Sequence, residues 1–299
     1  MRHAISFILS LFLAAALSAE DLDAHSPYGD GYQFKGLSVF VDAGVARVSN
    51  VHANFYNGSL TNANTINRVM HSEGYGQQMW NDLVSQSLIS PSAIQNFRQL
   101  EVVEYADMFY KIAYQIGFGF RYDYDSGLGW LLRFDLIELN SIGAFNLSSR
   151  NGTGILTNQN QYVRCGILGQ EKRINIDFAL THRFNRSGLF EWEIDFGCNV
   201  NNTSVLGNDI EVAGRLSNIL NVWGDMGPGY YNESMNYINQ GGIGVGGFAT
   251  ISACYKLMGS AISLGYTFYY TKINLEGYSA YAPQHNIFLR FDLNKFTFF

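Results

Sequence analysis

From Tyr110 to Tyr124 the sequence alternates, without a slip, between large apolar or aromatic side chains and small or polar ones. Successive side chains of a β-strand point to opposite faces, so this alternation predicts a strand with one apolar and one polar face. The run is about 15 residues long, whereas strands of soluble proteins usually have about 5–6. The fold must therefore supply an apolar environment along the whole length of an unusually long strand.

Seven further segments repeat the period of two, the first of them more weakly. They are residues 36–48, 130–137, 173–184, 189–200, 243–257, 261–273 and 285–299. Aromatic residues make up 15% of the chain and charged residues only 15%, against about 25% charged residues in a typical soluble domain. No segment after the first 19 residues has the 18 consecutive apolar residues of a helical membrane span. Strands whose alternate residues face lipid reconcile these observations.

The connections between the predicted strands alternate between short and long. Asp125–Gly129, Asn185–Gly188 and Met258–Ser260 are tight turns rich in Gly, Asn and Ser. An even number of strands, with short turns at one end and long loops at the other, is typical of an outer-membrane barrel. We therefore predict an all-β fold: a closed up-and-down antiparallel transmembrane β-barrel with a partly helical extracellular insertion. Eight strands fit best, and ten would result if the second long loop added two more.

The segment before the first strand is predicted to be an export signal. A short basic start precedes an apolar run of about 13 residues, which is too short to span a membrane, and small residues follow it. We predict a signal peptide at 1–19, a short periplasmic segment at 20–35 and the barrel at 36–299. The predicted extracellular loops are 49–106, 140–172, 201–241 and 274–284.

Packing arguments decide which face of the predicted strands points outward. A soluble barrel would turn its apolar face inward, but so many large side chains would overfill an eight-stranded interior. The opposite face is rich in Gly, Ala, Ser and Thr, whose sizes suit a narrow lumen. The predicted lipid-facing residues include Tyr110, Tyr114, Phe118, Phe120, Trp192, Phe196, Tyr266 and Phe268.

The lumen face carries charges of both signs in nearly equal number, and buried charges persist only when they are paired. The inward candidates are Lys111, Arg121, Arg133, Arg183, Lys256 and Arg290 against Asp123, Asp135, Asp177, Glu191, Glu193, Asp195 and Asp292. Counting back from the turns places Arg183 opposite Glu191 and Arg121 beside Arg133. We interpret the set as a structural salt-bridge network. The alternative is a narrow, gated ion path.

The long loops carry whatever is specific to this protein. Tyr75, Met79 and Leu83 recur at helical spacing, and Ser90-Pro91 is a start signal for a second helix. Residues 49–106 are therefore predicted to form a small cap packed on its own apolar stripes. The alternatives are a lid over the barrel mouth and a face that docks an extracellular partner. In the third loop, a helix is predicted at 210–223.

The sequence offers little chemistry. Three Cys residues form no complete disulfide framework, and no His, Cys or Asp spacing suggests a metal site, so no cofactor or metal is expected. A net charge of −6 argues against a nucleic-acid partner. A lipid-modifying enzyme using His285 with a loop Ser such as Ser279 is the least favoured alternative. We predict that the chain is not an enzyme.

The chain closes with RFDLNKFTFF, an alternating strand that ends on Phe299. This resembles the C-terminal assembly signal of Gram-negative outer-membrane barrels, and the overall plan resembles the small eight-stranded OmpA/OmpX-type barrels. The resemblance covers the strands but not the loops. It implies a bacterial outer-membrane location with surface-exposed loops, and as partners the membrane lipid and the barrel-assembly machinery. The predicted function is a porin-like or surface protein with a filled lumen, and a narrow channel for ions or small solutes is the alternative.

Overall fold

The computed structural model describes residues 36–91, 94–124, 126–149, 162–184, 190–220, 240–257 and 260–293. The predicted signal peptide (1–19), the segment 20–35 and the terminal Phe299 lie outside the described residues.

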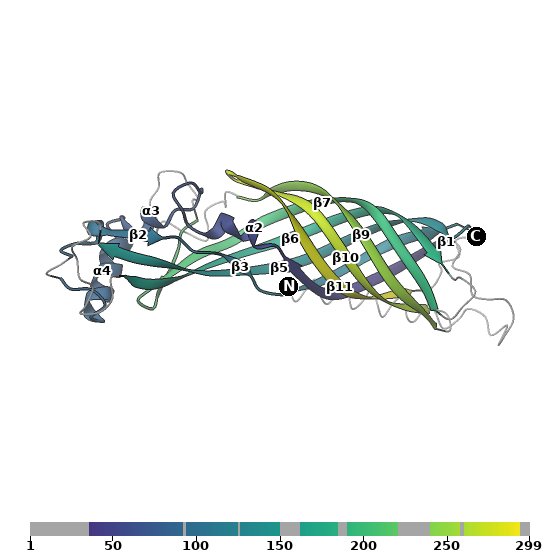
Figure 1. Ribbon diagram of the computed structural model, residues 1–299, viewed down its shortest axis with the longest axis horizontal. Coiled ribbons are helices and arrows are strands. Elements are labelled where there is room, and N and C mark those ends of the chain that lie inside the picture. Colours follow the sequence, from purple (N-terminus) through teal and green to yellow (C-terminus); the bar gives the residue numbers. More distant parts are fainter. Residues whose placement is uncertain are drawn as a thin grey trace.

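Eight strands close into a ring (Figure 1). Each pairs antiparallel with its neighbours, and the pairing of the first strand with the last closes the barrel. This confirms the predicted fold class and the predicted number of eight strands. In ring order they are β1 (Gly36–Val48), β4 (Ala113–Asp123), β5 (Leu128–Ser149), β6 (Val163–Phe184), β7 (Phe190–Val212), β9 (Gly242–Leu257), β10 (Ser260–Leu275) and β11 (Tyr278–Leu293).

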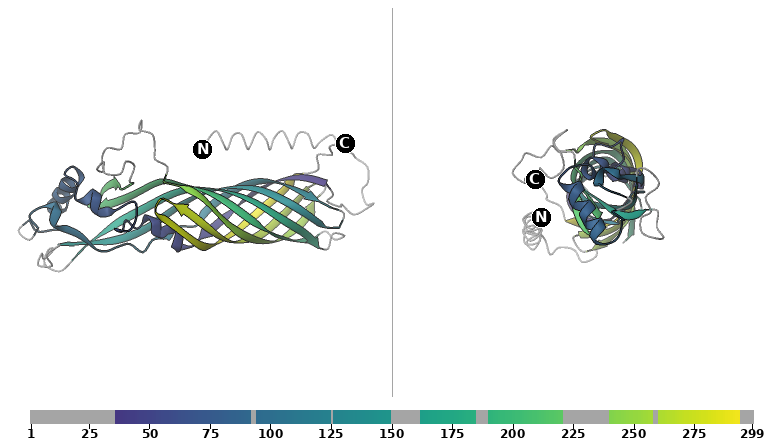
Figure 2. Two further views of the ribbon diagram at one scale, coloured as in Figure 1. Left: turned by 90° about the horizontal axis from the view of Figure 1, so that it is seen from above. Right: turned by 90° about the vertical axis from the view of Figure 1, so that its left-hand side faces the viewer.

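Three of these strands run far beyond the barrel. β5, β6 and β7 have 22, 22 and 23 residues, and their distal halves form a sheet that projects from the barrel mouth (Figures 1 and 2). β2 (Leu100–Glu104) pairs with the end of β5, and β8 (Arg215–Asn218) pairs with the end of β7. We call this extension, with β2 and β8, the arm.

The observed strand pairing corrects three of the predicted loop assignments. Much of 140–172 and the first part of 201–241 are strand, because inter-strand pairing continues past the barrel. The helix predicted at 210–223 is wrong for the described residues, since β7 extends to Val212 and β8 follows it. The predicted loop 274–284 shrinks to a turn at Glu276 and Gly277, where Gly277 has a φ of +69° that favours glycine.

Residues 49–91 and 94–99 include a group of short helices, and we call these residues the cap. The helices are α2 (Asn50–Ala53), η2 (Asn54–Tyr56), α3 (Ile66–Met70), α4 (Tyr75–Ser85) and η3 (Phe97–Gln99), and β3 (Phe109–Tyr110) follows β2 before β4 begins. α4 confirms the helix predicted from Tyr75, Met79 and Leu83. At Ser90, where a second helical turn was predicted to start, the backbone N–H of Ile94 donates to the Ser90 carbonyl oxygen at 3.0 Å, and η3 follows. None of the helices within the described ranges is long and apolar enough to cross a membrane.

The cap covers one face of the arm (Figure 2), and together they enclose an apolar core. Met79 and Leu83 of α4 are fully buried, as are Phe145 of β5, Ile167 of β6 and Ile210 of β7. The predicted Met79 stripe is thus a packing surface. Outside the barrel, the chain buries apolar side chains as an ordinary soluble domain does.

Candidate functional site

The outer wall of the barrel is apolar. Tyr114, Phe118, Trp192 and Phe196 are 82%, 43%, 53% and 73% exposed. Phe120, Tyr266 and Phe268 also alternate outward. A soluble surface does not carry so dense an apolar patch, whereas a barrel embedded in lipid requires one.

Two residues lie on the opposite face from the one predicted: Tyr110, which was expected to face lipid, and Lys111, which was expected to face the lumen. β3 ends at Tyr110 and β4 begins at Ala113, and the two residues between them, Lys111 and Ile112, are both exposed. This break shifts the alternation by one, so Tyr110 is buried at 9% exposure and Lys111 points outward. Uninterrupted alternation in the sequence hid the interruption of the strand.

The outward side chains mark where the membrane ends. On β6, the outward residues from Ile174 to Phe184 are apolar apart from His182, and the next outward residues toward the arm are Lys172 and Gln170. A membrane-spanning strand needs about 9–11 residues, which this segment matches. Beyond it the same strand faces water.

The lumen holds twelve of the thirteen charged residues predicted to point inward; Lys111 is the one outside it. All twelve are at most 9% exposed: Arg121, Asp123, Arg133, Asp135, Asp177, Arg183, Glu191, Glu193, Asp195, Lys256, Arg290 and Asp292. These side chains form layers along the barrel axis.

The layer nearest the β5–β4 and β6–β7 turns centres on Glu191 and Arg183. Lys256 Nζ lies 2.6 Å from Glu191 Oε1, and Arg183 lies 3.7 Å from Asp292 and 3.8 Å from Asp123. Paired charges of this kind replace the water that each group loses on burial.

The next layer centres on Glu193 of β7. Its carboxylate accepts hydrogen bonds from Arg121, from Arg290 at 3.1 Å and from Arg183 at 3.2 Å. Arg121 is also 3.5 Å from Asp195. One carboxylate thus ties together strands from three parts of the ring.

The middle layer centres on Arg133 of β5. Arg133 donates to Asp177 at 2.6 Å and to the Tyr269 hydroxyl, and it lies 3.1 Å from Asp135. Its guanidinium also sits 5.4 Å from the Phe248 ring centroid, within range of a cation–π contact. β5 and β10 stand on opposite sides of the ring, so the Arg133–Tyr269 contact crosses the lumen.

The sequence reasoning missed one lumen carboxylate and four inward aromatic rings. Asp42 accepts from Arg290 Nε at 2.9 Å, and the Arg290 guanidinium lies 4.1 Å from the Phe40 ring centroid. Period two would have placed all five inward, since each alternates with an outward residue. They are Phe40, Asp42, Phe248, Tyr269 and Phe288.

Glycines make room for two of these rings. A Cβ on Gly119 would lie 2.3 Å from the Phe40 ring, and one on Gly265 would lie 2.2 Å from the Phe288 ring. The small residues of the lumen face therefore accommodate large neighbours on adjacent strands, and leave less open space than their own sizes suggest.

Both predicted cross-strand pairs are displaced by two residues. Arg183 lies opposite Glu193 rather than Glu191, and Arg121 lies opposite Leu131 rather than beside Arg133. A shift by two keeps every side chain on its predicted face but changes its partner. The like-charged arginine pair is thereby avoided.

Between the charged layers and the arm, the lumen is filled first by hydrogen-bonded amide side chains and then by a charged cluster at the barrel mouth. Asn286 of β11 donates to Gln115 of β4. Above them, Arg173 Nε donates to Glu171 at 2.6 Å, and the Tyr56 hydroxyl of the cap donates to the same carboxylate at 2.6 Å. Burial beside Glu171 raises the pKa of Tyr56. We call Tyr56, Glu171, Arg173 and the neighbouring His52 the mouth cluster.

His52 connects the cap to two walls. Its Nδ1 lies 3.2 Å from Arg173 Nη1, and its Nε2 lies 3.2 Å from the Ala280 carbonyl oxygen. These partners suit a neutral ring in which Nε2 donates and Nδ1 accepts. Burial, with the positive charge of Arg173, lowers the pKa of His52 to about 3.

The predicted enzymatic pair does not assemble. His285 and Ser279 lie six residues apart on β11, which is about 20 Å along an extended strand. His285 instead contacts Tyr266, whose hydroxyl lies 2.7 Å from Nδ1. All three cysteines are free thiols, and no group of three potential metal ligands gathers within the described ranges.

Comparisons with known proteins find distant structural similarity alone. No protein-family model matches the chain, and no curated protein matches it. Neisserial surface protein A aligns at 11% identity and a TM-score of 0.37, covering 87% of this chain and 98% of that one. Ail of Yersinia pestis, in complex with a heparin analogue, aligns at 9% and 0.36, with coverage of 87% and 98%. OprG of Pseudomonas aeruginosa aligns at 9% and 0.32, with 87% and 94%. At this similarity, function must be argued from the chain's own residues.

Proposed function

We propose that this chain is a non-enzymatic, integral outer-membrane protein with a closed lumen, which holds its arm and cap at the cell surface. The observation that carries the proposal is the Arg133–Tyr269 contact across the lumen, within layers of buried ion pairs. The apolar outer wall supports membrane insertion. The length of the arm, about 11 residues or roughly 35 Å beyond the apolar band, supports a role outside it.

Closure of the lumen rests on contacts at three levels. Glu193 binds three arginines below, Arg133 reaches the opposite wall in the middle, and the mouth cluster joins the cap to β6 above. Eight-stranded barrels have an interior just wide enough for side chains. A solute would have to break several charge-assisted bonds in succession.

Planar-bilayer conductance of the full-length, refolded protein tests this proposal. We expect no sustained conductance from the native chain and intermittent steps from the double variant Arg133→Ala with Tyr269→Ala, which removes the contact across the lumen. Thr267→Ala, which deletes a buried lumen hydroxyl, is the matched control and should stay closed. Reproducible conductance steps from the native protein would overturn the proposal.

A narrow cation path is the second candidate, and the charge count of the lumen favours it. Within the described barrel strands below the mouth cluster, five cationic side chains face eight carboxylates. A surplus of carboxylates attracts cations into a pore. In that case the native chain conducts, and the reversal potential in a KCl gradient shows cation selectivity.

The outer-membrane lipid and the barrel-assembly machinery are the partners we assign to the barrel, and an extracellular partner to the exposed surface of residues 49–106. The buried Met79 stripe leaves only the exposed residues of the cap for such contact. Phe299→Ala should slow membrane assembly in cells, measured by the heat-modifiable gel shift. Unchanged assembly would remove the assigned role of the last strand.

The non-enzymatic assignment is tested with lipid substrates. The refolded protein is incubated with phospholipid and lipid A, and products are followed by mass spectrometry. We expect no turnover. Turnover that disappears in His285→Ala would replace this assignment with the lipid-modifying alternative.

A further inference from the structure

A ring of outward polar residues ends the apolar wall at the side of the arm. On strand after strand, the outward apolar run stops at a polar residue. These residues are Arg47 on β1, Lys111 before β4, Glu138 on β5, Lys172 on β6, Asn202 on β7, Lys272 on β10 and His285 on β11. We call them the rim.

The rim has a strong bias of charge. It holds four lysines or arginines and one histidine, but a single carboxylate, Glu138. The lumen below has the opposite excess, and the chain as a whole has a net charge of −6. Cations are therefore concentrated where lipid headgroups would meet the barrel.

Three rim residues lie on neighbouring strands. Arg47 is directly opposite His285 in the β1–β11 pairing, and opposed residues place their Cβ atoms about 4.5–5.5 Å apart. On the other side of β1, the pairing with β4 begins at Ala46 and Ala113, which brings Lys111 close to the same level. Tyr266 contacts His285 Nδ1 and leaves Nε2 available to a further partner.

The exposed cations of the rim differ from those of the cap and the arm. Arg98 pairs with Glu73 at 2.6 Å, and Arg215 pairs with Asp82 at 2.5 Å. Of the ion pairs found among the described residues, none involves Arg47, Lys111 or Lys272. A cation beside an apolar wall without a carboxylate partner is suited to an anion from outside the chain.

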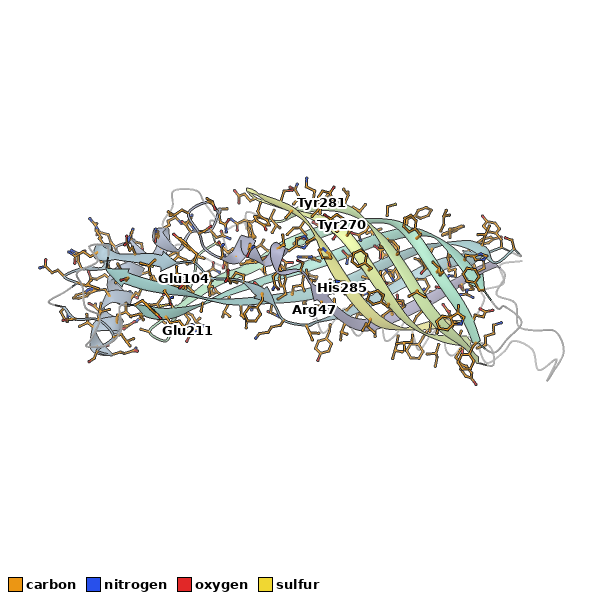
Figure 3. The ribbon with its side chains drawn as sticks, in the orientation of Figure 1. Arg47, Glu104, Glu211, Tyr270, Tyr281 and His285 are labelled. Carbon is orange, nitrogen blue, oxygen red and sulfur yellow. The ribbon has the colours of Figure 1, made fainter. Side chains whose placement is uncertain are left out.

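Aromatic rings accompany these cations. Tyr270 and Tyr281 stack with centroids 5.7 Å apart, and His285 packs 5.4 Å from Phe268. Figure 3 shows Arg47, His285, Tyr270 and Tyr281 at a similar position along the long axis, where the barrel meets the arm. Tyrosine is enriched where a membrane meets water, so these rings place the rim at the headgroup level.

We propose that Arg47, Lys111 and His285 form a binding site for the phosphate of a lipid headgroup in the outer leaflet. The site rests on the proposed membrane location of the barrel. Arg47 supplies a fork of donors that matches phosphate geometry, Lys111 adds a second positive charge, and the neighbouring rings pack against the lipid portion. The lipid source follows from the position of the site, at the edge of the apolar wall.

Native mass spectrometry of the full-length protein in detergent tests this site with diphosphoryl lipid A as the probe. Each of Arg47→Gln and Lys111→Gln should weaken lipid A binding about fivefold, since one basic residue near an anionic surface contributes about 1 kcal/mol. Arg98→Gln, which removes an equal charge from the cap, is the matched control and should leave the affinity unchanged. Phosphatidylcholine should bind more weakly than lipid A, and with no difference between the variants.

Three results would overturn the site. One is unchanged lipid A affinity in Arg47→Gln, and another is an equal loss in Arg98→Gln, which would indicate net charge alone. The third is displacement of lipid A by millimolar pyrophosphate, which would indicate a site for free anions. A heat-modifiable gel shift of every variant, with insertion into phosphatidylcholine vesicles, separates failure of this site from failure of the barrel itself.

Discussion

Three of the eight barrel strands, β5, β6 and β7, continue into the arm, and the two regions have opposite polarity. In the barrel, β6 turns Asp177 and Arg183 inward and Phe178 and Leu180 outward. In the arm, the same strand turns Ile167 inward and Gln170 outward. The backbone pairing continues through the change. Only the surrounding solvent differs, lipid for the barrel and water for the arm.

The comparison teaches that period two predicts a strand but does not say which face is the core. In lipid, apolar surface gains nothing by turning inward, and the interior must be filled with side chains that satisfy one another. In water, burial of apolar surface drives packing. The two halves of β6 obey these two rules within a single strand.

The largest expected effect comes from removing one member of the lumen network. Arg133→Met leaves Asp135 and Asp177 without their main partner, and breaking a buried pair in this way costs about 3–5 kcal/mol. The measurement is urea unfolding of the refolded protein, followed by the heat-modifiable gel shift. Arg98→Met removes an exposed arginine and should cost less than about 1 kcal/mol. A small loss in Arg133→Met would show that water replaces the network at little cost.

The next largest effect is expected from placing a charge on the outward face of β6, which is compared between the barrel and the arm. Phe178→Lys places a charge near the middle of the apolar wall and should cost about 2–4 kcal/mol. Gln170→Lys introduces a lysine on the same outward face of β6, but in the arm. It should change the free energy of unfolding by about 0.5 kcal/mol or less. Both are measured by unfolding in phospholipid vesicles. Equal effects would mean that lipid does not cover Phe178.

The fold could be predicted from the sequence because lipid imposes a rule on every residue of a spanning strand. Tyr114 and Arg121 could be assigned to opposite faces by counting alone. Counting failed at Tyr110 and Lys111, because the break between β3 and β4 leaves no mark in the alternation. It also failed for the residue directly opposite Arg183, which is Glu193, because the register depends on the geometry of the turn. The predicted partner Glu191 still lies 3.8 Å from Arg183.

The arm was predicted only in part, as two strands added by the second long loop, and its full extent could not be predicted for a different reason. Its strands carry mixed residues on both faces, since the outer face meets water and small residues such as Ala144 and Gly166 interrupt the pattern. The mouth cluster was also missed. It joins Tyr56 to Glu171, 115 positions apart in sequence, and no local pattern encodes such a contact.

A substitution in the apolar core between the cap and the arm tests whether this core and the barrel unfold independently. Met79→Ala leaves a cavity beneath α4 and should cost the cap about 2 kcal/mol or somewhat more. This core reaches the mouth ends of the barrel strands, at Val48 of β1 and Ile273 of β10, but the charged layers below are not part of it. The gel shift of the barrel should therefore persist while the cap becomes sensitive to protease. Leu60→Ala, which truncates a side chain that is 66% exposed, is the control. Simultaneous loss of the cap and the barrel would show that the two regions unfold as one unit.

The smallest expected effect, taken over a single pH unit, is a pH dependence where the two regions join. His52 has a folded pKa of about 3 against about 6.5 when unfolded, so the unfolded segment binds a proton that the folded one excludes. The stabilising contribution of neutral His52 is therefore complete above about pH 6.5 and is lost as the pH falls toward 3, by about 1.4 kcal/mol per pH unit. Hydrogen exchange of residues 50–56, referenced to the unfolded peptide at each pH, should show protection falling about tenfold per unit below pH 6. His52→Asn keeps a donor for the Ala280 carbonyl and an acceptor for Arg173 but does not titrate, so its protection should stay flat. A similar slope in this variant would assign the pH dependence to other groups and leave the junction between barrel and cap insensitive to His52.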